Sequence, residues 1–84
     1  MDVNEKVVEI LKELSGKDSI NESDRLQEEL GLDSLSMVTL LLEIEDTFLM
    51  ELNEVDMDPY RLITVADVIN LVKKYEVHDE KVDS

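Results

Sequence analysis

The fold is decided by residues 31–49, which read GLDSLSMVTLLLEIEDTFL. Asp33 can cap a helix that begins at Ser34 and runs to about Leu49. Because each residue turns a helix by about 100°, the apolar side chains fall on two neighbouring stripes. One stripe contains Met37, Leu40, Leu41, Ile44 and Phe48, and the other contains Leu35, Val38, Leu42 and Leu49. Such a helix lies centrally in a bundle, or it uses one stripe to contact something other than its own core.

The chain before this helix predicts one further helix and a long loop. Apolar residues recur at spacings of three and four over residues 3–14, which is typical of an amphipathic helix. Asp2 can cap its start, and Ser15 and Gly16 can end it. The polar connection over residues 16–33 is long, so we expect it to be functional or held against the core. The apolar residues available to hold it are Ile20, Leu26, Leu30 and Leu32.

The chain after this helix predicts two more helices. Asp58 and Pro59 suit the cap and the first position of a short helix that ends near Leu62. Thr64 then caps a last helix, and Asp67 three residues later gives a capping box. The inner face of the last helix contains Val65, Val68, Ile69, Val72 and Tyr75.

The predicted fold class is therefore all-α. We expect a four-helix bundle of three main helices and one short third helix, with a long first loop, as one domain over residues 1–76. Residues 77–84 are charged and aperiodic, so we expect them to form a disordered tail.

The composition excludes several classes of protein. The absence of cysteine removes disulfides, thiolate metal sites and a cysteine nucleophile. The first residues do not resemble a signal peptide, and no apolar run is long enough to span a membrane. We therefore expect a cytoplasmic protein without stable membrane insertion.

Acidic residues dominate the charge. Twenty-two acidic residues against eight basic ones give a formal net charge of −14. No Lys or Arg lies between Arg25 and Arg61, whereas ten acidic residues do. Such a surface repels nucleic acid and anionic membranes and attracts basic patches on other proteins, although a merely soluble surface has the same composition. We expect a monomer that has protein partners and no nucleic acid partner.

No residue pattern indicates catalysis or a metal site. The only histidine, His78, lies in the predicted tail without a catalytic neighbour. Asp56 and Asp58 resemble the beginning of a calcium-binding loop, but Pro59 and Tyr60 stand where further ligands and a turn glycine belong. No Gly-rich phosphate loop is present.

The motif at residues 31–35 carries the remaining chemistry. Gly31 lets the chain turn, Asp33 caps the helix, and Ser34 follows with an exposed hydroxyl. Free backbone N–H groups and the positive end of the helix dipole favour a phosphate at this position. An isolated Asp-Ser pair is ordinary helix-start chemistry, so the motif is informative only in its context.

That context resembles acyl carrier proteins. Gly31-x-Asp33-Ser34-Leu35 is similar to their attachment motif, and residues 63–69, ITVADVI, are similar to the start of their last helix. The length, acidity, long first loop and short third helix also resemble this family. The resemblance implies a non-catalytic carrier with 4'-phosphopantetheine on Ser34, flanked by Asp33 and Leu35. A phosphopantetheinyl transferase would move this arm from coenzyme A, and its thiol would hold an acyl intermediate as a thioester.

The resemblance also implies that partner enzymes recognise the second helix. These partners would be acyl-loading, condensing or transferring enzymes of fatty-acid or polyketide-type biosynthesis, with basic docking patches. The residues expected to face them are Met37, Glu43, Glu45 and Asp46. Ser36 and Thr39 stand where acids often follow the motif, and Phe48-Leu49-Met50 replaces a turn that is often polar or contains glycine. These departures favour a specialised pathway over the housekeeping fatty-acid carrier.

Two alternatives remain open from the sequence. An aminoacyl or peptidyl carrier of a nonribosomal peptide pathway has the same fold and arm, although such carriers are usually less acidic and embedded in large synthetases. An acidic adaptor that is not a carrier would have Asp33-Ser34-Leu35 by accident.

The second apolar stripe suggests a place for the cargo. Val38 and Leu42, near Ser34, could border a cleft whose opposite wall contains Leu62 and Ile63. A short apolar chain could fold back into this acyl cleft and hide its thioester from water. The alternative is that the stripe belongs to the core.

Overall fold

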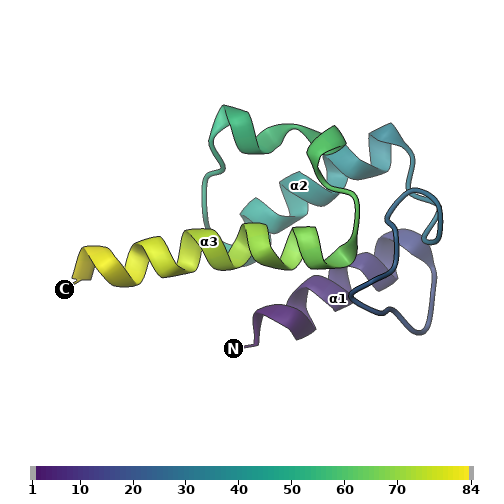
Figure 1. The fold of residues 1–84 in the computed structure, drawn as a ribbon, viewed down its shortest axis with the longest axis horizontal. Coiled ribbons are helices and arrows are strands. Elements are labelled where there is room, and N and C mark those ends of the chain that lie inside the picture. Colours follow the sequence, from purple (N-terminus) through teal and green to yellow (C-terminus); the bar gives the residue numbers. More distant parts are fainter. Residues whose placement is uncertain (1, 84) are drawn as a thin grey trace.

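The computed structural model describes the backbone of residues 2–83 and the side chains of residues 2–75. It contains three α-helices: α1 over Val3–Ser15, α2 over Ser34–Phe48 and α3 over Val65–Asp83. Both α2 and α3 pack against α1, and the segment that joins α2 to α3 forms an arch (Figure 1). The all-α class is confirmed, and no strand occurs within the described part of the chain.

Two 3₁₀ turns replace the predicted short third helix. The turn η1 covers Glu54–Met57, and η2 covers Pro59–Arg61. Asp58 between them is extended, because the Pro59 ring disfavours helical backbone in the residue before it. Asp58 still caps η2, since its Oδ1 accepts a hydrogen bond from the Tyr60 N–H at 3.0 Å. The cap was therefore predicted correctly, but the described residues form no fourth α-helix.

The predicted caps of α1 are confirmed. Asp2 Oδ1 accepts a hydrogen bond from the Asn4 N–H at 3.0 Å, which satisfies one of the free donors at the helix start. Gly16 follows the helix with a φ of 76°, and its N–H donates to the Lys12 carbonyl at 2.9 Å. Glycine adopts this left-handed conformation without steric cost, so it ends α1 sharply.

The start of α3 holds the long first loop in place. Asp67 Oδ2 accepts hydrogen bonds from the N–H groups of Ile63 and Thr64 at 2.9 and 3.0 Å, and Thr64 Oγ1 accepts one from the Asp67 N–H at 3.3 Å. This is the predicted capping box. The Leu26 N–H donates to the Ile63 carbonyl at 2.9 Å. The loop is thus tied to α3 by its backbone as well as by its apolar side chains.

The end of α3 lies further along the chain than the predicted end of the bundle at residue 76. Its backbone remains helical to Asp83. The side chains of residues 76–84 lie outside the described residues. The disordered tail over residues 77–84 and the spectator role of His78 therefore remain predictions.

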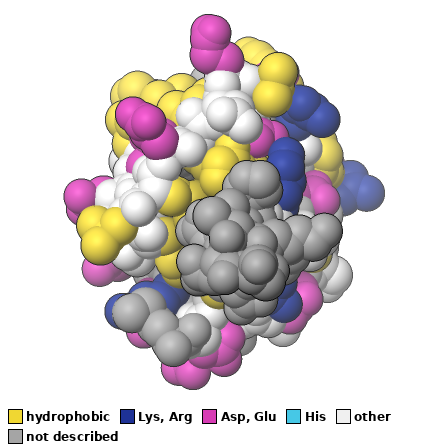
Figure 2. All heavy atoms as spheres, turned by 90° about the vertical axis from the view of Figure 1, so that its left-hand side faces the viewer, with side chains coloured by type: hydrophobic (Ala, Val, Ile, Leu, Met, Phe, Trp, Pro, Cys, Tyr) yellow, Lys and Arg dark blue, Asp and Glu magenta, His cyan; other side chains and the backbone are white. Residues whose placement is uncertain are grey.

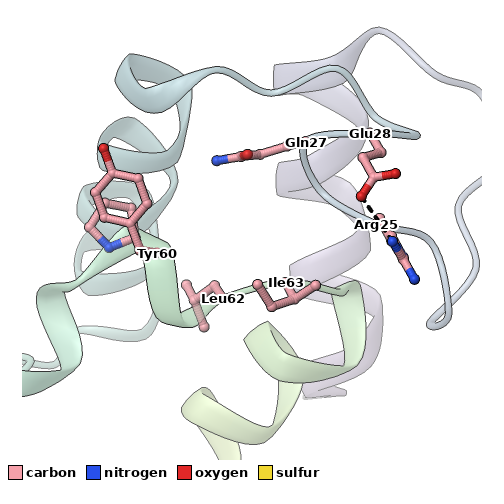
Figure 3. A pocket seen from close by; sticks show the side chains of 7 residues that line it. Arg25, Gln27, Glu28, Tyr60, Leu62 and Ile63 are labelled. Atoms are coloured by element: carbon pink, nitrogen blue, oxygen red, sulfur yellow. Dashed lines mark hydrogen bonds and ion pairs between the residues drawn. The ribbon is translucent and has the colours of Figure 1, made fainter.

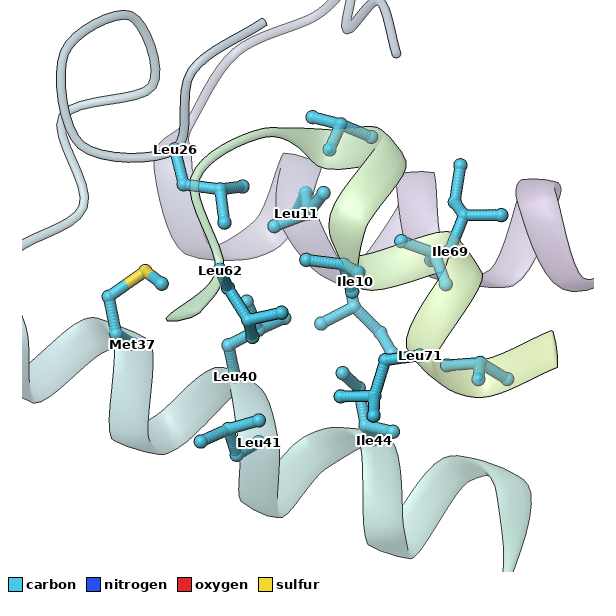
Figure 4. Close-up of a cluster of buried hydrophobic side chains, with 14 of the residues drawn as sticks. Ile10, Leu11, Leu26, Met37, Leu40, Leu41, Ile44, Leu62, Ile69 and Leu71 are labelled. Carbon is cyan, nitrogen blue, oxygen red and sulfur yellow. The ribbon is translucent and has the colours of Figure 1, made fainter. Parts of the chain in front are cut away.

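The core fills the space between the three helices (Figure 4). All four apolar residues that were expected to hold the first loop lie against it, with Ile20 partly buried and the other three fully buried. The buried residues, in chain order, are Val3, Val7, Ile10, Leu11, Leu26, Leu30, Leu32, Met37, Leu40, Leu41, Ile44, Leu52, Leu62, Val65, Val68, Ile69, Leu71 and Val72. Within the described side chains, no buried polar atom lacks a hydrogen-bond partner.

The two stripes of α2 have different environments. Met37, Leu40, Leu41 and Ile44 of the first stripe are at most 1% exposed, and Phe48 is partly buried. The second stripe faces solvent, with exposed fractions of 75% for Leu35, 41% for Val38, 53% for Leu42 and 89% for Leu49. The core of this chain therefore leaves the second stripe uncovered, as one of the two sequence interpretations expected.

Leu49 ends α2 in the left-handed conformation, with a φ of 52° and a ψ of 51°. A side chain with a Cβ atom is strained there by about 1 kcal/mol. The Met50 N–H donates to the Glu45 carbonyl at 3.0 Å and so closes the last turn. The turn that the sequence marked as unusual at Phe48-Leu49-Met50 thus places an exposed leucine where glycine is the common choice.

Candidate functional site

The Ser34 site is built by three neighbours with separate tasks. Gly31 has a φ of 71°, so the chain turns in a conformation that favours glycine. Leu32 is buried, and its N–H donates to the Leu26 carbonyl at 3.0 Å, which anchors the turn. Asp33 then caps α2, because its Oδ1 accepts a hydrogen bond from the Ser36 N–H at 2.8 Å. Ser34 follows as the first residue of α2 and is exposed.

The electrostatics of this helix start suit an anionic group. The Ser36 N–H holds the pKa of Asp33 below its usual value, so the cap is ionised at neutral pH. The first turn of α2 contains no acidic residue. The remaining free N–H groups and the positive end of the helix dipole therefore face the surroundings of the Ser34 hydroxyl without an acidic side chain from that turn.

Comparison with known proteins identifies the family. A family model described as "Phosphopantetheine attachment site" matches residues 5–72. The chain belongs to the acyl carrier protein family. It is 33% identical to an acyl carrier protein of Rickettsia bellii (strain RML369-C) over 76 residues, which are 88% of this chain and 86% of the relative. It is 37% identical to that of Syntrophus aciditrophicus (strain SB), over 87% of this chain and 91% of the relative.

The family match settles three expectations from the sequence. The resemblance to acyl carrier proteins is confirmed, and so is phosphopantetheine as the group that the family carries. Acyl carrier proteins are non-catalytic, so the carrier is not an enzyme.

A third relative, the acyl carrier protein of Campylobacter curvus (strain 525.92), is 33% identical over 87% of this chain and 90% of its own length.

The residues predicted to face partners do not share one environment. Glu43 and Asp46 are exposed on α2. Glu45 is partly buried, and its Oε2 accepts a hydrogen bond from the Leu52 N–H at 2.8 Å, so it holds the following loop. Met37 is fully buried on the core stripe beside Leu40 and Leu41, and its predicted role at the partner surface is therefore wrong. The sequence pattern had grouped Met37 with Leu40 and Leu41 on one stripe, and the structure buries that stripe.

Acidic side chains are distributed widely over the surface of the carrier. Figure 2 shows them around the end of the molecule where α3 leaves the bundle, with hydrophobic side chains between them. This face therefore combines apolar groups with carboxylates.

The four residues of the predicted acyl cleft do not all line the same pocket. Leu62 is buried and Ile63 is exposed, and both line a pocket of about 120 Å³ (Figure 3). Val38 and Leu42 do not line this pocket. Its other walls are Arg25, Gln27, Glu28, Pro59 and Tyr60. The backbone hydrogen bond from the Leu26 N–H to the Ile63 carbonyl brings residues 25–28 and 59–63 together. No local sequence pattern indicates such a pairing.

The pocket lies at the Ser34 end of α2. The turn η2, which supplies Pro59 and Tyr60, contacts α2 and lies beside its N-terminal part (Figures 1 and 3). On the opposite wall, Arg25 and Glu28 form an exposed ion pair at 2.9 Å. The pocket therefore combines apolar and polar side chains in its walls.

Two kinds of feature are absent from the described part of the carrier. None of its helices is long and apolar enough to cross a membrane. No group of three or more His, Cys, Asp or Glu side chains there is arranged to hold a metal ion.

Proposed function

We propose that the protein carries an acyl intermediate as a thioester on a 4'-phosphopantetheine arm attached to Ser34. It delivers this cargo to enzymes of fatty-acid or polyketide-type biosynthesis. The exposed position of Ser34 at a capped helix start, within the residues that match the family, carries the proposal. In the attachment step the Ser34 oxygen attacks the phosphorus that bears the pantetheine, loses its proton, and displaces the nucleotide part of coenzyme A.

The flanking residues have distinct tasks in this proposal. Asp33 keeps the helix start, and hence the Ser34 hydroxyl, in a fixed position through its bond to the Ser36 N–H. Leu35 is 75% exposed next to Ser34, so a transferase can contact it directly. Loading assays with acyl transferases and with adenylating enzymes separate an acyl carrier from an aminoacyl or peptidyl carrier. We expect acyl loading only.

We place the carrier in a specialised pathway. In the first turns of α2, Ser36 and Thr39 stand where acids often follow the motif. The Thr39 hydroxyl donates to the Leu35 carbonyl at 3.1 Å and is therefore turned back onto its own helix. Exposed acids on α2 begin only at Glu43, so a partner meets apolar side chains nearest to Ser34 and charge further along.

Partner enzymes dock on the exposed face of α2 through basic patches. Reversal of two exposed acids, Glu43→Lys with Asp46→Lys, is expected to raise the KM of the transferase for this carrier about tenfold. The effect should shrink as added salt shortens the Debye length below about 8 Å. Steady-state kinetics of arm attachment at several salt concentrations measure both trends.

The matched control changes the net charge equally but on another part of the molecule. Glu5→Lys with Asp18→Lys reverses exposed acids on α1 and in the first loop. We expect a much smaller change in KM for this pair. Equal effects of the two double variants would mean that net charge alone matters, and would contradict docking on α2.

The end of a short acyl chain occupies the pocket lined by Leu62 and Ile63. Each methylene removed from water contributes about 0.8 kcal/mol at most, so the melting temperature of the acylated carrier should rise with chain length. The chemical shifts of Ile63 should change with it. Differential scanning fluorimetry and NMR on a series of acyl lengths measure these effects.

Two alanine variants make this test specific. Ile63→Ala removes part of the pocket wall and should abolish the dependence on chain length. Val55→Ala removes a similarly exposed side chain that does not line the pocket, and should leave the dependence intact. A melting temperature that is the same for all chain lengths would place the cargo in solvent.

A further inference from the structure

The segment that joins α2 to α3 is a strap of residues 50–63, which arches between the two helices (Figure 1). Its first half begins at a firm anchor. The Leu52 side chain is buried, and its N–H donates to Glu45 Oε2 at 2.8 Å. Its last residue is equally well held, because the Ile63 N–H donates to Asp67 and its carbonyl accepts from the Leu26 N–H.

A cluster around Tyr75 joins the first half of the strap to α3. The Tyr75 hydroxyl accepts a hydrogen bond from the Asn53 N–H at 2.8 Å and donates one to Asp56 Oδ2 at 2.6 Å. Lys74 Nζ lies 3.2 Å from both carboxylate oxygens of Asp56. The Asp56 side chain is only 9% exposed although it is charged. Two charge-assisted contacts on a shielded carboxylate make this a strong polar link between the strap and α3.

The ionisation of the cluster agrees with its geometry. The Tyr75 hydroxyl, assisted by Lys74, lowers the pKa of Asp56, whereas burial raises the pKa of Tyr75. At neutral pH the carboxylate is therefore charged and the phenol retains the proton that it donates. Both hydrogen bonds of the Tyr75 hydroxyl and the ion pair of Asp56 with Lys74 can therefore form at neutral pH.

The second half of the strap has no comparable link. Among the residues that the structure describes, the hydrogen bonds of residues 57–62 stay within the strap itself. They join Tyr60 and Arg61 to Asp58, Arg61 to Val55, and Leu62 to Pro59. This half contains η2 and supplies three walls of the pocket: Pro59, Tyr60 and Leu62. The packing of Met57 and Leu62 against the core and the contact of η2 with α2 hold this half in place.

We propose that Tyr75 is a positioning residue that latches residues 52–56 of the strap to α3, so that only residues 57–62 swing when the pocket opens. The latch itself rests on the contacts described above. Its effect on cargo rests on the proposed function. Residues 52–56 then stay fixed and residues 57–62 move as a lid over the pocket. Cargo enters and leaves beside Tyr60 and Leu62.

Amide hydrogen exchange of the unacylated full-length protein tests the latch without any cargo. Tyr75→Phe removes one hydroxyl and keeps the ring, so it deletes both bonds to the strap. We expect exchange at residues 52–56 to become about tenfold faster, because one to two hydrogen bonds are lost, while α1 and α2 keep their protection. Tyr60→Phe is the matched control, since the Tyr60 side chain is 73% exposed, and it should change nothing in this segment.

Two results would overturn the latch. Unchanged exchange at residues 52–56 in Tyr75→Phe would show that the hydroxyl does not hold the strap. A uniform rise over all three helices would show that Tyr75 serves only global stability. Asp56→Asn, which keeps the size of the acceptor but removes its charge, provides a second route. It should speed exchange in the same segment, and failure to do so would also contradict the proposal.

Hydrolysis of an acyl thioester on the arm separates the latch from the proposed function. If the lid covers cargo, the thioester of the acylated Tyr75→Phe carrier should hydrolyse faster than that of the acylated natural chain. Equal hydrolysis together with segment-limited exchange would support the latch and overturn the pocket as the cargo site. Faster hydrolysis without any change in exchange would overturn the latch.

Discussion

Ser34→Ala is expected to abolish attachment of phosphopantetheine while the bundle stays folded. Alanine removes the only oxygen at this position that can be joined to the phosphate, and it is readily accommodated at the first residue of α2. Because Ser34 is exposed, the free energy of unfolding should change by no more than about 0.5 kcal/mol. Incubation with coenzyme A and a broad-specificity transferase, followed by intact mass measurement, gives the modified fraction.

Ser36→Ala is the control for this experiment. Ser36 lies one half-turn further along α2, and its backbone N–H, which binds Asp33, is kept in the variant. It should be modified as fully as the natural chain. Modification of the Ser34→Ala protein, or a natural chain that never gains the mass of the arm, would contradict the carrier function.

Leu41→Ala and Leu42→Ala are expected to have very different effects although the residues are neighbours. Leu41 is 1% exposed on the core stripe, so its truncation leaves a cavity and should destabilise the protein by about 2–5 kcal/mol. Domains of this size have a total stability of about 5 kcal/mol, so this variant should be largely or partly unfolded. Leu42 is 53% exposed on the second stripe, and its truncation should cost less than about 0.5 kcal/mol. Urea unfolding followed by circular dichroism measures both values.

The proposed docking of partners on the exposed face of α2 predicts a second effect of Leu42→Ala. Leu42→Ala should raise the KM of the transferase, because an apolar contact with the partner is lost while the fold is intact. Leu35→Ala, nearer to Ser34, should do the same. Similar losses of stability for Leu41→Ala and Leu42→Ala would mean that α2 is surrounded by core on both stripes, which would contradict the exposed face described here.

The helix boundaries were largely predictable because they depend on neighbours in sequence. Asp2, Asp33 and Thr64 are caps that accept hydrogen bonds from N–H groups two or three residues away. Gly16 ends α1 through its own backbone preference. The attachment motif is also local, since Gly31, Leu32 and Asp33 directly precede Ser34 and position it. The one contact from further away is the burial of the Leu32 side chain in the core.

The candidate site was less predictable wherever two distant segments meet. The pairing of residues 25–28 with residues 59–63 forms the pocket, and the whole of α2 and the first part of the strap lie between these two segments in the sequence. The predicted cleft joined Leu62 and Ile63 to Val38 and Leu42 from helical periodicity alone. Periodicity tells which side of a helix a residue lies on, but it does not tell where another segment packs. The cluster of Tyr75 with Asn53 and Asp56 was missed for the same reason.

The sequence by itself determined the helical class, the caps, the two stripes of α2 and the family, because these depend on the order and spacing of nearby residues. Only the tertiary structure decided which stripe is buried, since α1 and α3 supply enough apolar surface for one stripe and leave Leu35, Val38 and Leu42 in solvent. It also decided that Met37 belongs to the core and that Tyr75 reaches the strap. Burial depends on what the rest of the chain brings to a surface, and that information lies in contacts between residues far apart in sequence.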